Sequence, residues 1–153
     1  MIKITIDGFD DVLQEFQNAP IQILKETEKA LAKSATTIES NLVKELKRKR
    51  INDTGKLSQS ITISKPRPLA VLIEVKSKYG RFVEDGTKPH PVAPALLRGW
   101  AQRKLGNANL AFAVANKIRV KGTKPKHFFR DGVELSKSPI QSYFNEILVN
   151  ALA

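Results

Sequence analysis

The 153-residue sequence contains no cysteine. This absence excludes disulfide bonds, thiol nucleophiles and zinc sites built from cysteine. It fits a reducing compartment such as the cytoplasm, where disulfides are rare. The sequence also lacks an apolar run of about 20 residues, the length that a membrane-spanning helix needs. We therefore expect neither a disulfide-stabilised scaffold nor a protein that crosses a membrane.

Aromatic residues and catalytic motifs are also scarce. Aromatics make up 7% of the sequence, which is few for a platform on which nucleic-acid bases stack. Gly55 and Lys56 suggest a phosphate-binding loop, but no glycine lies five residues earlier and Leu57 occupies the place of the required Ser or Thr. No other nucleotide-binding, serine-hydrolase or zinc-protease motif occurs. We expect no enzymatic activity and no cofactor.

The two histidines, His90 and His127, each lie close behind a Lys-Pro pair. A metal site there would need further ligands, and Asp85 and Asp131 are the only nearby candidates. Ordinary surface histidines are the favoured interpretation. Glu84 and Asp85 would point to opposite faces of a strand, so they make a poor acid–base pair. We expect no metal site.

Positive charge is abundant: the sequence has 26 Lys and Arg against 15 Asp and Glu, a net charge of +11. Such a field favours nucleic acid, an anionic membrane or an acidic protein surface, although it also serves solubility alone. The densest group is Lys44, Lys47, Arg48, Lys49 and Arg50, at the end of a predicted helix. These cations either complement the negative helix end or bind phosphates. The first interpretation is favoured, because no aromatic residue is interleaved for base stacking.

The length suits a single domain over residues 1–153. Residues 1–6 alternate apolar and polar, which predicts a strand, and residues 9–17 predict a short helix. A long helix is expected from Pro20 to about Arg50. Its apolar stripe comprises Leu24, Leu31, Ala35, Ile38, Leu42 and Leu46. About 30 residues span about 45 Å, so either part of the helix projects or a partner subunit covers the rest.

The remaining pattern alternates strands and helices. Residues 60–64 and 69–76, joined by the basic Lys65–Pro68 tip, predict an antiparallel hairpin. Residues 95–105 and 109–120 predict a helical hairpin whose Trp100 contacts the core. Ser138 caps the predicted last helix. The expected fold class is α+β: an antiparallel sheet of three to four strands packed on one long N-terminal helix, with the helical hairpin at one edge and a C-terminal helix.

A segment that runs from Tyr79 to a Gly-Thr-Lys-Pro turn at Gly86 organises the chain. Its apolar residues Tyr79, Phe82 and Val83 predict burial, and Gly86 permits a tight turn. A second Gly-Thr-Lys-Pro turn begins at Gly122, and a Phe-Phe pair follows it. We therefore predict that the segment between the two turns leaves the core and returns to it.

Three blocks of sequence resemble a known family. They are Asp-Thr-Gly-Lys-Leu-Ser-Gln-Ser-Ile at 53–61, Tyr-Gly-Arg-Phe-Val-Glu-Asp-Gly-Thr at 79–87, and Lys-Pro-Lys-His-Phe-Phe at 124–129. In order and spacing they are similar to the small tail-completion (minor tail, head-to-tail joining) proteins of tailed bacteriophages and prophages. The resemblance extends from Asp53 to about Glu134. Where the family has a small apolar residue after the last block, this chain has Asp131-Gly132.

The resemblance implies a structural virion or prophage protein of the tail or neck that acts by ring assembly, without catalysis. Implied partners are the phage connector and tail-tube proteins and further copies of the chain, often in a hexameric ring. The implied location is the virion tail or neck, and the host cytoplasm during assembly. The charge alone suggests an alternative, a basic non-sequence-specific nucleic-acid-binding module, but no helix-turn-helix, zinc-finger or aromatic-sheet signature supports it.

Candidate interaction residues are those that the predicted core does not need. Loops held by a rigid scaffold commonly carry contacts, which favours the 65–68 tip, the 88–94 loop and the end of the long helix. The candidates are Arg67, Lys88, His90, Lys124, Lys44, Lys47, Arg48, Lys49 and Arg50. A non-specific DNA contact is a second role for the basic helix end.

Overall fold

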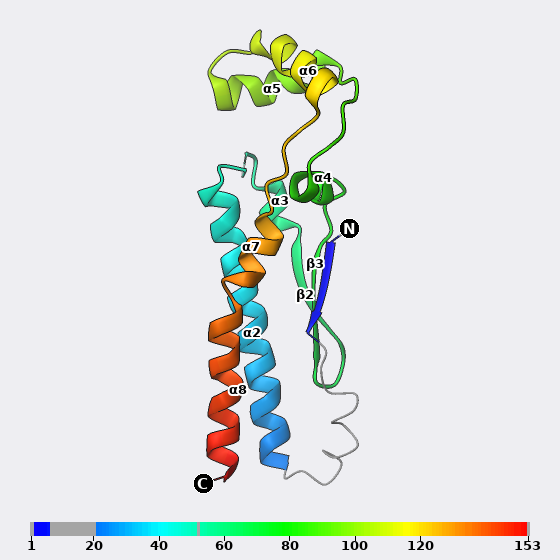
Figure 1. Cartoon of the computed structure of the whole chain (residues 1–153). Coiled ribbons are helices and arrows are strands. Elements are labelled where there is room, and N and C mark those ends of the chain that lie inside the picture. Colours follow the sequence, from blue (N-terminus) through cyan, green and yellow to red (C-terminus); the bar gives the residue numbers. More distant parts are fainter. Residues whose placement is uncertain (1, 7–20, 52, 153) are drawn as a thin grey trace.

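The computed structural model describes residues 2–6, 21–51 and 53–152. The molecule is elongated, with a sheet packed against a long helix and a helical hairpin at one end (Figure 1). The elements are β1 (Ile2–Ile6), α2 (Ile21–Arg48), α3 (Lys56–Gln59), β2 (Ile61–Arg67), β3 (Ala70–Val75), α4 (Gly80–Asp85), α5 (Pro94–Leu105), α6 (Leu110–Lys121), α7 (Phe128–Glu134) and α8 (Lys137–Leu152). The α+β class is confirmed; the predicted helix at 9–17 lies outside the described residues.

Helix α2 is the central element against which much of the molecule packs. Its 28 residues span about 42 Å at 1.5 Å per residue. The predicted stripe faces the core: Leu31, Ala35, Ile38, Leu42 and Leu46 are buried, with a partly buried leucine at its start. Both α7 and α8 pack along α2, and β3 packs on it from the sheet side. This arrangement differs from both predicted alternatives, because helices of the same chain cover α2.

The sheet has three antiparallel strands in the order β1-β3-β2. The central strand β3 pairs with both neighbours, so that Ile73 lies opposite Ile4 of β1 and Ile63 of β2. Alternate residues of a strand share a face, and the buried Val71, Ile73 and Val75 form the face that meets α2. β2 continues through Arg67 with an irregular register, so much of the predicted tip is strand.

The Phe-Phe pair returns the chain to the core, as predicted. Phe128 and Phe129 are both buried, and their rings meet edge to face with centroids 6.4 Å apart. One turn later Gly132 touches α2: a Cβ built there would lie 3.1 Å from the Cα of Leu42. This close approach explains why a glycine follows Asp131.

The start of α8 differs slightly from the prediction. The helix begins at Lys137, so Ser138 lies inside it instead of capping it. The buried Ser136 marks the junction, since its hydroxyl donates to the carbonyl oxygen of Gly132 at 2.8 Å and accepts from the amide of Asn41 at 2.9 Å. These bonds tie the α7–α8 junction to α2.

The segment after Tyr79 is a helix, and its predicted burial is wrong for two residues. Tyr79 and Phe82 are 44% and 58% exposed, respectively. In a helix of this short length only one side faces the protein. That side carries Val83 and the buried carboxylate of Glu84, so the aromatic side chains lie on the outer side.

Candidate interaction site

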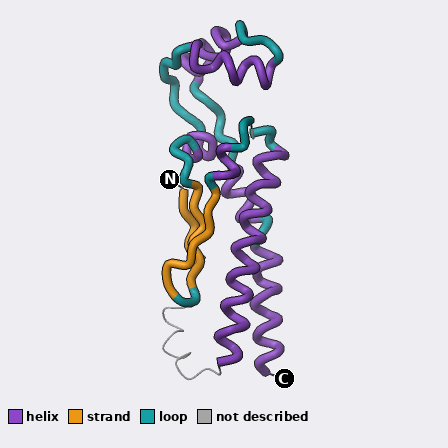
Figure 2. The backbone as a smooth tube through the Cα atoms, turned by 180° about the vertical axis from the view of Figure 1, so that it is seen from behind, coloured by secondary structure: helices purple, strands orange, loops and turns teal. Residues whose placement is uncertain are grey.

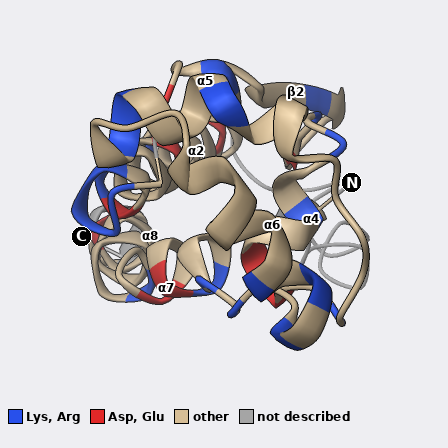
Figure 3. Cartoon of the chain, turned by 90° about the horizontal axis from the view of Figure 1, so that it is seen from above, with Lys and Arg blue, Asp and Glu red and all other residues tan. Residues whose placement is uncertain are grey.

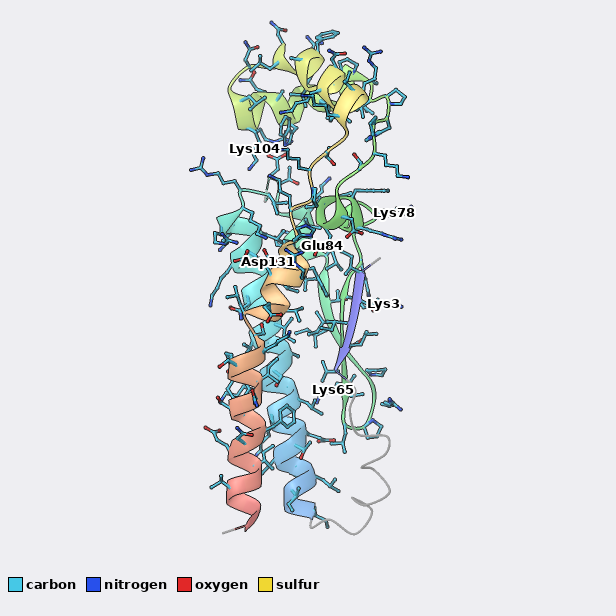
Figure 4. All side chains as sticks on the ribbon, viewed as in Figure 1. Lys3, Lys65, Lys78, Glu84, Lys104 and Asp131 are labelled. Carbon is cyan, nitrogen blue, oxygen red and sulfur yellow. The ribbon has the colours of Figure 1, made fainter. Side chains whose placement is uncertain are left out.

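Glu84 fixes the point at which the chain re-enters the core. Its Oε2 accepts a hydrogen bond from the backbone N–H of Phe129 at 2.8 Å, and its Oε1 accepts one from that of Arg130 at 3.0 Å. These donors belong to the first turn of α7, where backbone N–H groups have no partner within the helix and the helix dipole favours negative charge. Figure 4 labels Glu84 beside the start of α7 and Asp131 on α7 itself. Glu84 therefore ties α4 to α7.

The two Gly-Thr-Lys-Pro turns lie against each other. Thr87 and Thr123 form an antiparallel bridge, with N···O distances of 3.0 and 3.1 Å and a 3.0 Å contact between their hydroxyls. Gly86 and Gly122 have φ angles of 74° and 68°. A Cβ on Gly122 would lie 1.9 Å from the carbonyl oxygen of Thr87, so this crossing needs glycine. The predicted excursion that leaves the core and returns is therefore present.

Between the turns, α5 and α6 pack against each other as the predicted helical hairpin. The hairpin lies beyond the end of the sheet and α2 (Figure 1), not at the sheet edge as predicted. Its buried side chains are small ones, Ala101, Ala111 and Ala115. The large apolar residues of the two helices are therefore half-buried or exposed.

The hairpin is joined to the body by a polar contact, and a cavity lies between them. Arg103 Nη2 lies 2.6 Å from Asp53 Oδ2, and its hydrogen bonds hold the pKa of the Asp53 carboxyl below its usual value. A cavity of about 250 Å³ lies here between Trp100 of α5 and body residues that include Leu57 and Val83. Trp100 is half-buried and lines this cavity together with the buried core residue Leu57.

Lys49 points inward, unlike the outward-facing cation that the sequence predicts. Its Nζ donates to the carbonyl oxygens of Lys126 and His127 at 2.6 and 3.1 Å and to the carboxylate of Asp131, and it lies 3.5 Å from Glu45. Its side chain is only 14% exposed. The hydrogen bond from Lys49 is the main reason why the pKa of Asp131 lies below its usual value. Lys49 therefore joins α2 to α7.

The other cations of this helix end remain at the surface. Arg48 forms hydrogen bonds of 2.6 and 2.8 Å to Glu45, and these lower the pKa of that carboxyl. Lys44 and Lys47 are exposed on α2, and Arg50 is exposed just after it in a left-handed conformation with φ 54°. The group is therefore split between internal ion pairs and solvent-facing side chains.

The remaining predicted residues fall into two separate places. Lys88, His90 and Lys124 are exposed on the paired segments that lead to and from the hairpin. The His90 ring lies 2.9 Å from the carbonyl oxygen of Lys88. Arg67 lies at the far end of the β2–β3 hairpin, away from the helical hairpin (Figure 1). The structure thus brings together the residues of the two turns but not Arg67.

The histidines gather no further ligands in the part of the chain that the structure describes, where no cluster of three metal-binding side chains occurs. Nor is any helix in the described ranges both long enough and apolar enough to span a membrane. The absence of a metal or cofactor stays a prediction.

The positive charge is concentrated in one segment of the chain, which the comparison of single residues did not reveal. Residues 86–130 contain ten Lys and Arg and no Asp or Glu, whereas the rest of the chain has sixteen basic and fifteen acidic residues. The structure places this segment in the hairpin, its two connections and the start of α7. Figure 3 shows basic residues on both α5 and α6. A count of charge by segment would have found this surface.

A model of the HK97-gp10_like family, described as "Bacteriophage HK97-gp10, putative tail-component", matches residues 10–86. The match spans half of the chain and includes α2, β2, β3 and α4. The chain belongs to this family. The predicted resemblance to phage tail proteins is confirmed at that level. No curated protein and no solved structure matches the chain significantly.

By family membership, the chain is therefore a structural tail component of a bacteriophage. The matched region ends at Gly86, where the first of the two connections begins. The helical hairpin, with most of the net charge, lies beyond the match. The family findings give no support to the alternative of a nucleic-acid-binding module.

Proposed function

We propose that this protein completes the phage tail or joins it to the head, as a ring of identical copies and without catalysis. The observation that carries the proposal is the family match over residues 10–86. The proposal includes the phage connector and tail-tube proteins as neighbours, a location at the tail or neck, and assembly in the host cytoplasm.

The body of the molecule suits a structural role. Helix α2, the sheet, α7 and α8 share one apolar core. The Lys49–Asp131 ion pair joins α7 to α2, and the buried Glu84 carboxylate joins α7 to α4. Rigid elements of this kind hold exposed loops and arms in fixed positions. The same chain therefore presents its candidate contacts, Arg67, Lys88, His90, Lys124 and the exposed cations near the end of α2, at fixed places.

Deletion of the gene from its phage or prophage tests the proposal. The expected products are separate heads and tails, or tails with abnormal ends, in electron micrographs of the lysate. A plasmid copy of the wild-type gene should restore joined, infectious particles. Intact infectious particles from the deletion strain would contradict the proposed function.

The ring is tested separately by the number of copies in each particle. Quantitative mass spectrometry of purified virions, calibrated against a virion protein of known copy number, measures this number. Our proposal expects six copies. A single copy per particle would contradict ring assembly but would leave the assignment to the tail unchanged.

The exposed cations at the end of α2 allow a test of a DNA contact. Non-specific binding to phosphates weakens with salt, and its logarithm falls by about 0.9 per contacted phosphate for each tenfold rise in salt. Lys44→Gln combined with Lys47→Gln should reduce duplex-DNA binding more than Lys25→Gln combined with Lys76→Gln if this helix end faces DNA. Equal losses would mean that the bulk charge alone binds DNA.

A further inference from the structure

The helical hairpin leaves apolar surface uncovered. Eleven large apolar residues are exposed among those that the structure describes, and five of them are Leu96, Leu105, Leu110, Phe112 and Val120 of α5 and α6. Leu96 is 80% and Phe112 63% exposed. Two antiparallel helices whose buried side chains are only alanines gain little hydrophobic stabilisation from packing together. Exposed apolar residues concentrated in one hairpin favour a contact with another molecule.

The hairpin is also positively charged and has no acidic residue of its own. Its sequence and connections contain no carboxylate between Asp85 and Asp131. Arg103 is paired with Asp53 of the body. In contrast, the exposed Arg98 and Lys117 form no ion pair within the described part of the chain. A partner that carries negative charge would therefore be attracted to this end of the molecule.

The apolar and basic side chains share the same faces of α6. Phe112 and Arg119 are seven residues apart, and Ala113, Lys117 and Val120 follow the same three-and-four spacing. Protein interfaces combine apolar and aromatic contacts with arginine in this way. Surfaces that bind DNA are more polar, because their contacts are mainly to phosphates. The mixture therefore favours a protein partner.

The hairpin is placed for such a contact. Figure 2, seen from behind, shows it beyond the ends of the sheet and α2, joined to the body by two loops. The Thr87–Thr123 bridge holds these loops together where they leave the body. The Arg103–Asp53 pair fixes one side of α5. The outer surface of the hairpin is thus presented in a defined position.

We propose that the α5–α6 hairpin is a docking arm that binds an acidic, partly apolar surface of a different protein of the virion. Charge complementarity identifies the partner: a second copy has the same net charge of +11, and outside residues 86–130 its charges nearly balance. The inference rests on the proposed function, because that function supplies the neighbouring virion proteins.

The binding test uses heads and tails purified separately from a strain that lacks the gene. Purified full-length protein is mixed with each, and the bound fraction is measured by sedimentation. Arg98→Glu combined with Lys117→Glu should weaken binding to heads or to tails at least about tenfold, because like charges then oppose each other across the interface. Lys25→Glu combined with Lys76→Glu makes the same charge change on the body and should leave binding within about twofold.

A second pair of variants tests the apolar contact. Leu96→Ser combined with Phe112→Ser should weaken the same binding about tenfold or more, as expected for residues at the centre of an interface. Ile21→Ser combined with Val149→Ser is the matched control, since both side chains are exposed on the body. Circular dichroism should show that all four double variants keep the helix content of the wild type.

Three outcomes would overturn the docking arm. Hairpin variants that bind heads and tails as wild type does would show that the hairpin is not an interface. Binding that weakens only toward duplex DNA, used as a third probe, would make the partner nucleic acid. Loss of self-association in solution as the sole defect would make it another copy. In each case the deletion strain tests the proposed function independently: separate heads and tails in that strain support the proposed function even if the docking arm is refuted.

Discussion

Glu84 offers the sharpest test of how the body is held together. Its buried carboxylate accepts two backbone hydrogen bonds, at 2.8 and 3.0 Å, from the first turn of α7. Hydrogen bonds to a charged group contribute about 1.5–3 kcal/mol each, and buried donors left without a partner cost about 1–3 kcal/mol. Because such terms are not additive, we expect Glu84→Ala to lower the free energy of unfolding by about 3 kcal/mol.

A change of that size is readily measured. For a chain of this length, 1 kcal/mol corresponds to about 2–4 °C in Tm, so Glu84→Ala should lower Tm by roughly 6–12 °C. Glu84→Gln keeps the shape but loses the charge and one acceptor, so it should fall between Glu84→Ala and the wild type. Urea denaturation followed by circular dichroism gives the free energies directly.

Asp85→Ala is the matched control for this prediction. Asp85 is the next residue of α4 but is exposed, and its carboxylate lies 3.5 Å from the exposed Arg81. Its removal should change stability by less than about 0.5 kcal/mol. Hydrogen exchange at the amides of Phe129 and Arg130 should quicken in Glu84→Ala alone. Equal stability of Glu84→Ala and Asp85→Ala would refute the role of the carboxylate.

Two further predictions concern the same end of the body. Gly122→Ala places a methyl group against the carbonyl oxygen of Thr87, so it should abolish slow hydrogen exchange at the amide of Thr123 in the Thr87–Thr123 bridge. Gly106→Ala is the control: Gly106 has a similar positive φ but open space around it, so this variant should keep the protection. The pKa of Asp131 is lowered by Lys49, so its contribution to stability is fully present above the unfolded pKa of about 3.9 and is lost as pH falls through the lower folded value. Asp131→Asn should flatten the acid loss of stability in that window; an unchanged pH profile would contradict the pairing.

Much of the fold follows from patterns in the sequence. The apolar stripe of α2 has a clear helical period, and alternation at residues 71–75 identifies a strand with one buried face. Turn residues such as Gly106 mark the end of α5, where φ is 74°. These signals are local, so they can be read without knowledge of what packs against each element.

The misplaced details depend on contacts between distant residues. Tyr79 and Phe82 suggest burial by type, but the segment forms one short helix whose inward side is taken by Glu84. The sequence suggests that Lys49 is a surface cation, but in the structure α7 places Asp131 next to it. Burying a carboxylate or a lysine is favourable only if a partner satisfies its charge. The partners of Glu84 and Lys49 lie 45 or more residues away in the sequence. Local patterns carry no record of such pairs.

The location of the protein in the mature particle tests the central claim most directly. A cryo-electron microscopy reconstruction of the purified phage, with gold-labelled antibody against this chain as a marker, would show where it lies. The proposal predicts density for α2, the sheet and the hairpin in a ring at the end of the tail that meets the head. Absence of the chain from purified particles, or its presence only at the distal tip of the tail, would contradict it.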